Sequence, residues 1–121
     1  MTKPLTYKSE ADVKKEVKRL LTEHKFLYWM PPGSAFGNST VDFHALKGGV
    51  FMAIETKFGS NTATALQLKH LRAVRDNGGI AVVVSDDRMD AFAEMLKAMA
   101  ERPDWYSPTA NVLTKEIDVS A

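Results

Sequence analysis

Residues 40–58 read TVDFHALKGGVFMAIETKF, two β-prone runs separated by Gly48 and Gly49. Paired glycines between such runs are typical of a β-hairpin, because a two-residue primed turn requires positive φ at its central residues. We therefore predict strands over Thr40–Lys47 and Val50–Phe58, joined by a tight turn. This hairpin decides the fold, because the loop length fixes which residues of the two strands face each other.

The predicted register brings two acidic residues together. With a two-residue loop, Lys47 pairs with Val50, and Asp42 then lies directly opposite Glu55. Opposed Cβ atoms in an antiparallel pair are about 4.5–5.5 Å apart, and side chains alternate between the two faces of a strand. Both acids therefore share a face with Lys57. That face also carries Thr40, His44, Leu46, Phe51 and Ala53, and the opposite, apolar face carries Val41, Phe43, Ala45, Val50, Met52 and Ile54.

Opposed carboxylates repel each other, and a hard divalent cation between them would remove the repulsion. Mg²⁺ prefers oxygen ligands and is commonly held by one or two carboxylates together with a substrate phosphate. Lys57 points the same way as Glu55, so it can neutralise charge on a phosphoryl group or orient the attacking water. The alternative is a surface salt-bridge cluster in which Lys57 only balances the acids. The spacing favours the catalytic interpretation.

The rest of the chain supplies three helices and two further strands around the hairpin. The expected elements are a helix from Ser9, with a capping box to Asp12, to about His24; a short strand over 25–30; a helix from about Thr64 to Asn77; a buried strand over 80–84; and a last helix over about 87–100. The order α-β-β-β-α-β-α predicts an α/β domain with a central mixed sheet flanked by helices.

Two polar residues fall where apolar residues belong. At about 100° per residue, Glu10 lies within the apolar arc of the first helix, and Gln67 lies within the inward arc of the second. Since both helices must pack on the sheet, we expect both residues to approach Asp42 and Glu55. The alternatives are that Glu10 only stabilises the positive end of the helix dipole, and that Gln67 is a buried amide bonded to the nearby loop.

Length and composition restrict the class of protein. The 121 residues suffice for one domain with one core, and 45% apolar with 26% charged residues are typical of a globular chain. No apolar run approaches the roughly 20 residues needed to cross a bilayer, and Met1–Glu10 has no apolar stretch suited to a signal peptide. The absence of cysteine excludes disulfides and thiolate metal sites. We therefore expect a cytoplasmic protein.

Charge is uneven along the chain. Residues 1–85 hold twelve Lys or Arg against seven Asp or Glu, whereas residues 86–121 hold four against eight. A basic first part suits contact with phosphates, and an acidic end would stay away from them. Solvated faces of uneven charge are an equally open alternative.

The ordered motifs resemble those of the PD-(D/E)XK nuclease superfamily, and most closely its VRR-NUC branch. The early helical acid Glu10 is followed by SAFG at 34–37, VD at 41–42, AIETK at 53–57, TALQ at 64–67 and NGGIAVV at 77–83. The ETK tripeptide alone is a weak signal, but the set keeps the family's order and spacing from about residue 9 to 85. The resemblance implies a PD-(D/E)XK nuclease-like core in a single domain over 1–121, with the core at about 9–100 and a tail over 101–121.

The resemblance implies a metal centre in this core. Asp42, Glu55 and the backbone carbonyl of Thr56 would bind Mg²⁺, and Mn²⁺ would substitute for it. Glu10 would be a nearby or water-mediated ligand.

The resemblance also assigns two residues that are not ligands. Lys57 would be the catalytic lysine, and Gln67 would help to position the site. Val41 departs from the pattern, since the family usually has proline before the aspartate. That proline shapes the backbone and binds no metal, so the departure leaves the expected chemistry in place.

The family also suggests the substrate. VRR-NUC proteins are structure-specific DNA nucleases, and small stand-alone members resemble phage and bacterial enzymes that resolve four-way junctions as homodimers. A chain this short, without an added DNA-binding domain, fits that type, and two-fold symmetry would present two active sites to two strands of a junction. The expected partners are branched DNA and a second copy of the chain, with no membrane and no organic cofactor. A phage-encoded member would work in the host cytoplasm.

Affinity for DNA should come mostly from Lys and Arg on phosphates, and it should therefore fall with salt. The loop over 34–39 leads into Asp42, so its polar residues could meet the DNA backbone near the cut. The candidate contacts are Lys14, Lys18, Asn38, Ser39, Lys47, Lys69 and Arg72. Each of them could also be a solvated surface residue.

Five further aromatic or histidine positions have no assigned role in the chemistry. His44 could be a proton shuttle or a histidine packed on the sheet, and His24 and His70 are interpreted as structural or surface residues. Trp105 and Tyr106 in the tail could cap the core, join a dimer or stack on bases.

Three hypotheses follow. In the first, the chain is a Mg²⁺-dependent endonuclease for branched DNA: water attacks phosphorus, the metal stabilises charge on a non-bridging oxygen and Lys57 assists. In the second, the same chemistry acts as a nickase or on flaps, ends or ordinary duplex. In the third, the domain has lost its chemistry and only binds DNA or a protein partner.

Overall fold

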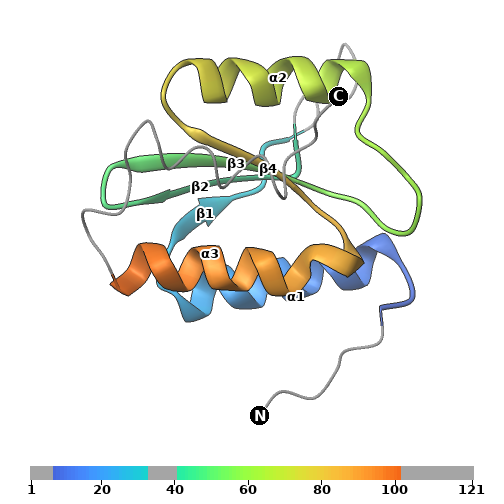
Figure 1. The fold of residues 1–121 in the computed structure, drawn as a ribbon, viewed down its shortest axis with the longest axis horizontal. Coiled ribbons are helices and arrows are strands. Elements are labelled where there is room, and N and C mark those ends of the chain that lie inside the picture. The colour runs from blue at the N-terminus through green and yellow to red at the C-terminus, as the bar shows by residue number, and fades with distance from the viewer. Residues whose placement is uncertain (1–6, 33–40, 102–121) are drawn as a thin grey trace.

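The computed structural model describes residues 7–32 and 41–101, which form an α/β fold (Figure 1). Four strands make one sheet in the order β1-β2-β3-β4, and it is mixed because β1, β2 and β3 pair antiparallel while β3 and β4 pair parallel. The elements are α1 (Glu10–Glu23), β1 (Leu27–Trp29), β2 (Phe43–Lys47), β3 (Val50–Thr56), α2 (Ala65–Asp76), β4 (Ile80–Val84), the short 3₁₀ helix η1 (Asp86–Arg88) and α3 (Met89–Glu101). The predicted order of helices and strands is confirmed, and η1 is added to it.

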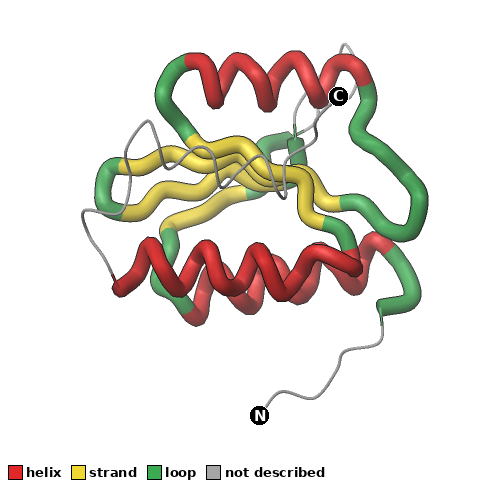
Figure 2. Tube along the Cα trace, in the orientation of Figure 1, coloured by secondary structure: helices red, strands yellow, loops and turns green. Residues whose placement is uncertain are grey.

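The sheet lies between two helical layers, with α2 on one face and α1 and α3 on the other (Figure 2). The buried faces of α1 and α3 provide much of the larger core. A smaller cluster on the α2 side joins Leu71 to Ala53 and Ala81 of the sheet. No helix within the described residues is both long and apolar enough to cross a membrane.

The hairpin has the predicted turn and register. Gly48 and Gly49 have φ values of 59° and 83°, as a two-residue primed turn requires. The ladder runs from Lys47 opposite Val50 to Phe43 opposite Ile54, where it ends. Asp42 and Glu55 are the next residues on the two sides, and both strands end earlier than predicted.

The early end of the ladder makes one prediction wrong. Val41 was expected on the face of Phe43, but it packs with Ala53 and Leu71 on the α2 side. Strict alternation of faces holds only while a strand stays extended and paired, and β2 begins at Phe43. The residues before it are therefore free of that constraint.

The helix starts differ in their caps. At α2, the Thr64 N–H donates to Gln67 Oε1 at 2.9 Å and the Gln67 N–H donates to Thr64 Oγ1 at 3.2 Å, a complete capping box. At α1, Ser9 accepts from the Asp12 N–H, but the Asp12 carboxylate accepts from the Lys8 N–H at 2.8 Å. The capping box predicted for Ser9 and Asp12 is therefore only half formed.

The end of α1 carries backbone strain. The Phe26 N–H donates to the Leu21 carbonyl at 2.9 Å, and Lys25 between them has a φ of 64°. This left-handed position after a helix usually holds glycine, since a side chain there meets the carbonyl oxygen. At the end of α2 the equivalent position is Gly78, with a φ of 94°.

We predict that Lys25→Gly raises the free energy of unfolding by about 0.5–1 kcal/mol, because it relieves the left-handed strain. Urea denaturation monitored by circular dichroism measures the change. Lys15→Gly is the control, since Lys15 is exposed within α1 and glycine there should lower stability by about 1 kcal/mol. A loss of stability in both variants would mean that Lys25 is not strained.

Part of the prediction falls on residues 33–40 and 102–121. Asn38, Ser39, Trp105 and Tyr106 lie there, outside the described residues. Of the expected tail over 101–121, only Glu101, the last residue of α3, is described.

Candidate active site

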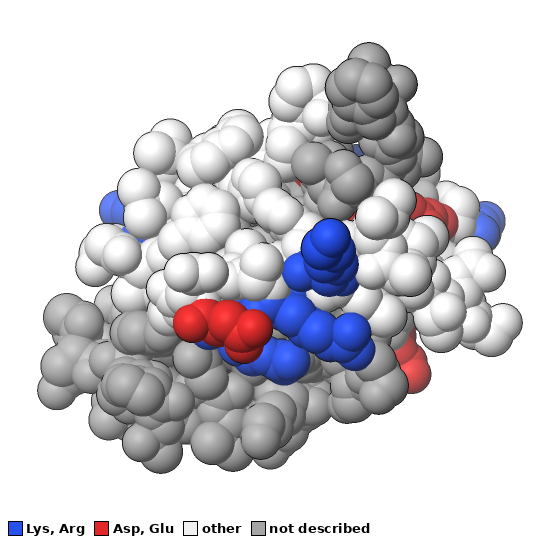
Figure 3. Space-filling model, turned by 90° about the horizontal axis from the view of Figure 1, so that it is seen from above, with Lys and Arg blue, Asp and Glu red and all other residues white. Residues whose placement is uncertain are grey.

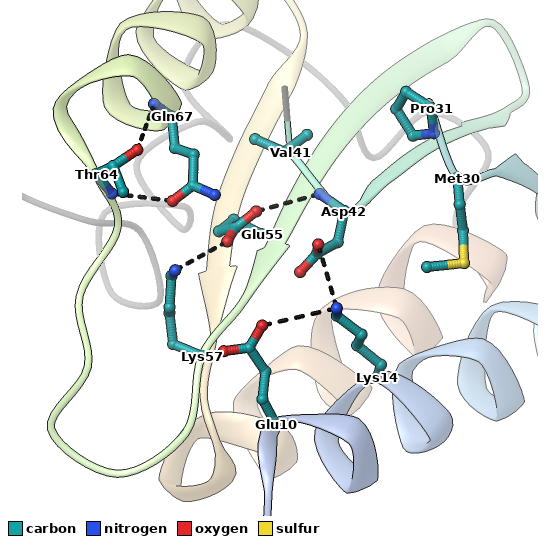
Figure 4. A pocket seen from close by; sticks show the side chains of 10 residues that line it. All are labelled: Glu10, Lys14, Met30, Pro31, Val41, Asp42, Glu55, Lys57, Thr64 and Gln67. Carbon is teal, nitrogen blue, oxygen red and sulfur yellow. Dashed lines mark hydrogen bonds and ion pairs between the residues drawn. The ribbon is translucent and has the colours of Figure 1, made fainter. Parts of the chain in front are cut away.

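A cleft of about 450 Å³ opens at the end of the sheet where α1 begins and β3 ends (Figure 4). Its walls come from α1, from the residues that follow β1 and precede β2, from β3 with the residue after it, and from the start of α2. The lining residues are Glu10, Lys14, Met30, Pro31, Val41, Asp42, Glu55, Lys57, Thr64 and Gln67. Five of them are the residues expected to carry catalysis.

Three carboxylates converge in this cleft. Glu10, Asp42 and Glu55 each offer an oxygen atom, and these oxygens lie within 4.8 Å of one another. Asp42 and Glu55 come from the two sides of the hairpin, and Glu10 comes from the first turn of α1. Glu10 therefore reaches the hairpin acids, as its place in the apolar arc of the helix led us to expect.

The two oxygens of Asp42 have different surroundings. Oδ2 accepts from the Thr56 N–H at 3.0 Å and from the Thr56 hydroxyl. Oδ1 lies 3.6 Å from Lys14 Nζ. Thr56 therefore anchors one side of the carboxylate and leaves the other side toward the cleft. The hydroxyl contact was not predicted, because nothing in the local pattern indicates that the Thr56 side chain would bond to Asp42.

The Thr56 carbonyl was expected among the ligands. Within a strand, the N–H and C=O of one residue point to the same side. The Thr56 N–H meets Asp42, so its carbonyl also points toward the side of β3 on which Asp42 lies.

Glu55 is a buried carboxyl with a displaced pKa. Its side chain is 1% exposed, Oε1 accepts from the Asp42 N–H at 3.1 Å and Oε2 lies 3.2 Å from Lys57 Nζ. Burial, and after it the negative charge of Asp42, raises the pKa of Glu55 to about 7, although the contact with Lys57 opposes the rise. A further positive charge placed next to such a carboxyl stabilises its deprotonated form.

Lys14 is the second cation of the cleft. Its ammonium lies 3.7 Å from Glu10 Oε2 and 3.6 Å from Asp42 Oδ1. The sequence suggested a phosphate contact for Lys14, whereas in this structure it faces two of the three acids. Its position could have been foreseen from helical spacing, since Glu10 and Lys14 are one turn apart.

Gln67 lines the cleft but its carbonyl is occupied. Oε1 accepts from the Thr64 N–H in the capping box, so the interpretation as an amide bonded to the nearby loop is correct for this oxygen. The side chain is 8% exposed, and Figure 4 shows it between Thr64 and Glu55. Gln67 thus caps the start of α2, and its side chain lines the cleft that contains the three acids.

No family model and no curated protein matches this chain. The chemistry of the cleft must therefore be inferred from its own residues.

The cleft suits a hard divalent cation. Two ligands of one Mg²⁺ lie at most about 4.2 Å apart, twice the bond length of about 2.1 Å. The three carboxylate oxygens lie within 4.8 Å, so side-chain shifts of well under an ångström would bring them onto one ion. The donors are all oxygens, which favours Mg²⁺ or Mn²⁺ over metals that prefer imidazole or thiolate.

The other described candidates for DNA contact lie away from the cleft. Among Lys14, Lys18, Lys47, Lys69 and Arg72, only Lys14 lines it. Lys47 sits at the turn end of the hairpin, 5.7 Å from the centre of the Phe26 ring. Lys69 and Arg72 are exposed on α2, and Lys and Arg side chains gather over that helix in Figure 3. This basic surface on α2 suits contact with phosphates outside the cleft.

Two histidines form a contact that the sequence did not indicate. His44 Nε2 and His70 Nε2 lie 3.0 Å apart, so one ring must donate and the other accept. Trp29 and Phe51 pack around His44, with ring centres 5.8 and 5.0 Å from it. Burial, and after it the nearby His70, lowers the pKa of His44. His44 does not line the cleft, which favours the packed histidine over the proton shuttle.

We predict that His70→Ala lowers the free energy of unfolding by about 1 kcal/mol, because it leaves a half-buried imidazole nitrogen without its partner. Cation binding at the three acids should not change. Thermal unfolding and Mn²⁺ titration measure the two quantities, with Lys69→Ala on the same helix as the control. An unchanged stability would show that the contact between the rings does not form in solution.

Proposed function

We propose that this chain is a divalent-metal-dependent DNA endonuclease that hydrolyses phosphodiester bonds. The observation that carries the proposal is the convergence of Glu10, Asp42 and Glu55 with the ammonium of Lys57 in one cleft. An acidic cluster by itself has many explanations. Here one acid is almost fully buried, which is unfavourable unless a cation or a proton neutralises it.

The resemblance to PD-(D/E)XK nucleases supports the same proposal. The family's order of motifs selected Glu10, Asp42, Glu55, Lys57 and Gln67, and these residues line one cleft. An acid of the first helix, a hairpin and a crossover helix around a mixed sheet form the core that the resemblance implies. The α/β fold and its sheet order are compatible with that core.

The residues of the cleft would have different roles in this reaction. A bound Mg²⁺ would supply Lewis-acid chemistry at the scissile phosphate and make water more acidic. Asp42, held on one side by Thr56, presents its other oxygen to the cleft. The Lys57 ammonium lies 3.2 Å from Glu55 Oε2, where it can also stabilise negative charge that develops on the phosphate.

Branched DNA is the proposed substrate and a homodimer the proposed assembly. Both follow from the resemblance to small stand-alone VRR-NUC proteins. The matched test compares cleavage of a duplex, a flap and a four-way junction of shared sequence, each with Mg²⁺ or with EDTA. Light scattering after size exclusion measures the mass in solution.

We expect cutting only with the divalent cation, with the four-way junction cut fastest, and a mass twice that of the chain. Equal rates on all three substrates would leave a nuclease without the junction preference. Binding without any product, at every Mg²⁺ and Mn²⁺ concentration, would replace the enzyme with a binding module.

A further inference from the structure

The ammonium of Lys14 occupies the space between two of the three acids. It lies 3.7 Å from Glu10 Oε2 and 3.6 Å from Asp42 Oδ1, whereas the ammonium of Lys57 lies on the opposite side, next to Glu55 Oε2. Figure 4 shows Lys14 reaching from α1 toward both carboxylates. The acidic cluster is therefore flanked by one lysine on each side.

The Lys14 side chain is held more loosely than that of Lys57, the other lysine of the cleft. Charge-assisted N–H···O bonds measure about 2.7–2.9 Å, and both Lys14 contacts are longer than 3.5 Å. They are thus electrostatic contacts without hydrogen-bond geometry. The side chain of Lys14 is also 33% exposed, against 13% for Lys57. Moving the Lys14 ammonium from the acids into solvent should therefore cost little free energy, whereas the more buried Lys57 is confined.

The oxygen that Lys14 faces is the one available to a cation. Thr56 occupies Asp42 Oδ2 with two hydrogen bonds, which leaves Oδ1 toward the cleft and toward Lys14. A divalent ion that binds Asp42 through Oδ1 and also binds Glu10 must take the place of this ammonium. Glu10 and Asp42 cannot contact the Lys14 ammonium and a divalent ion at short range at the same time.

We propose that Lys14 is a displaceable counter-ion: it neutralises Glu10 and Asp42 in the metal-free protein, and the incoming divalent cation displaces it. This inference rests on the proposed metal site. Once displaced, the flexible four-carbon side chain keeps its charge at the rim of the cleft, where a phosphate of the bound DNA would lie. Lys14 thus lowers the affinity of the DNA-free protein for metal. When metal and DNA are both bound, it contributes to the binding of DNA.

Two substitutions with opposite expected effects test this role. Lys14→Met removes the charge and keeps an unbranched side chain, so the metal-free acids lose their counter-ion. Lys14→Arg keeps the charge and adds a planar fork that binds carboxylates in a bidentate manner, so the acids are held more firmly. Lys18→Met is the control, because Lys18 is exposed one turn further along α1 and does not line the cleft.

The measurement is Mn²⁺ binding by isothermal titration calorimetry at pH 8 and low salt, without DNA, on the full chain. We expect Lys14→Met to bind Mn²⁺ roughly three- to ten-fold more tightly than the native chain, Lys14→Arg to bind more weakly and Lys18→Met to stay within about two-fold. Thermal unfolding in EDTA should show the reverse order, with Lys14→Met the least stable.

The outcomes separate the two proposals. If the native chain binds Mn²⁺ and Lys14→Met matches Lys18→Met, the counter-ion role is wrong and the metal site stands. If Lys14→Arg binds Mn²⁺ as tightly as Lys14→Met, competition for the acids is also wrong. If the native chain and Lys14→Met both bind no Mn²⁺, the metal site itself is wrong.

Discussion

Replacing Glu55 with glutamine is expected to reduce metal-dependent cleavage by at least about 100-fold, since even loss of groups that only support a metal ligand lowers activity by roughly 10–100-fold. Glutamine keeps the size of the side chain and its ability to accept from the Asp42 N–H, but it removes the charge. The expected loss is therefore in chemistry and in metal affinity, while DNA binding through phosphate contacts elsewhere should remain. Gel assays of cleavage and of binding to the same labelled junction measure both.

Stability distinguishes loss of chemistry from loss of folding. Glu55 is 1% exposed, so in the metal-free protein its charge is unfavourable, and Glu55→Gln should be at least as stable as the native chain at pH 8. Asp42→Asn should also abolish cutting. Glu23→Gln is the matched control, because Glu23 is 54% exposed at the end of α1. Normal cutting by Glu55→Gln or Asp42→Asn would mean that the metal site is misplaced.

The second large effect is the dependence of stability on pH and metal together. The pKa of Glu55 is raised to about 7 in the folded chain, against an ordinary value near 4.3 in an unfolded chain. Between these values the folded state holds a proton that the unfolded state has lost. The contribution of Glu55 to stability is therefore present at low pH and declines as pH rises toward 7. In EDTA we expect a decline of up to about 4 kcal/mol, at roughly 1.4 kcal/mol for each pKa unit.

Metal should reverse this decline. A cation binds the deprotonated carboxylates, so binding releases protons and strengthens with pH. At a metal concentration of about 100 times Kd, the stabilisation is roughly 2.7 kcal/mol, which corresponds to an increase in Tm of roughly 10 °C for a domain of this size. We expect most of that increase at pH 8 and little at pH 5.5.

Thermal scans with Mn²⁺ and with EDTA at the two pH values measure this effect. In EDTA, Glu55→Gln should lose most of the decline in stability between pH 5.5 and pH 8, whereas Glu23→Gln should keep it. The same increase in Tm at both pH values, in the native chain and in Glu55→Gln alike, would place the bound metal elsewhere.

The hairpin was predictable because its information is local. Two adjacent glycines specified the turn, the turn specified the register, and the register left Asp42 and Glu55 next to the last pair of the ladder, Phe43 and Ile54. The inward faces of the first two helices were predictable for the same reason, because they follow from the helical repeat of apolar residues. Glu10 was found because an acid within an apolar arc is a conflict visible in the sequence.

The wrong or incomplete predictions concern interactions between distant parts of the chain. Val41 was assigned by alternation beyond the point where the ladder ends. The bond between His44 and His70 joins β2 to α2 across 26 positions, and its formation depends on how the helix sits on the sheet. Lys14 was interpreted as a phosphate contact, because the sequence shows its spacing from Glu10 but not how closely α1 brings its first turns to Asp42.

The central claim is that Glu10, Asp42 and Glu55 share one divalent cation, and a crystal of the protein grown with Mn²⁺ tests it directly. Anomalous diffraction would locate the ion. We expect a single strong peak at about 2.0–2.3 Å from Asp42 Oδ1 and from a Glu55 oxygen, with Glu10 bound to the same ion directly or through one water. Lys14 Nζ should lie farther from Asp42 than its present 3.6 Å. A cleft without an anomalous peak at saturating Mn²⁺, with Lys14 still between the acids, would contradict the claim.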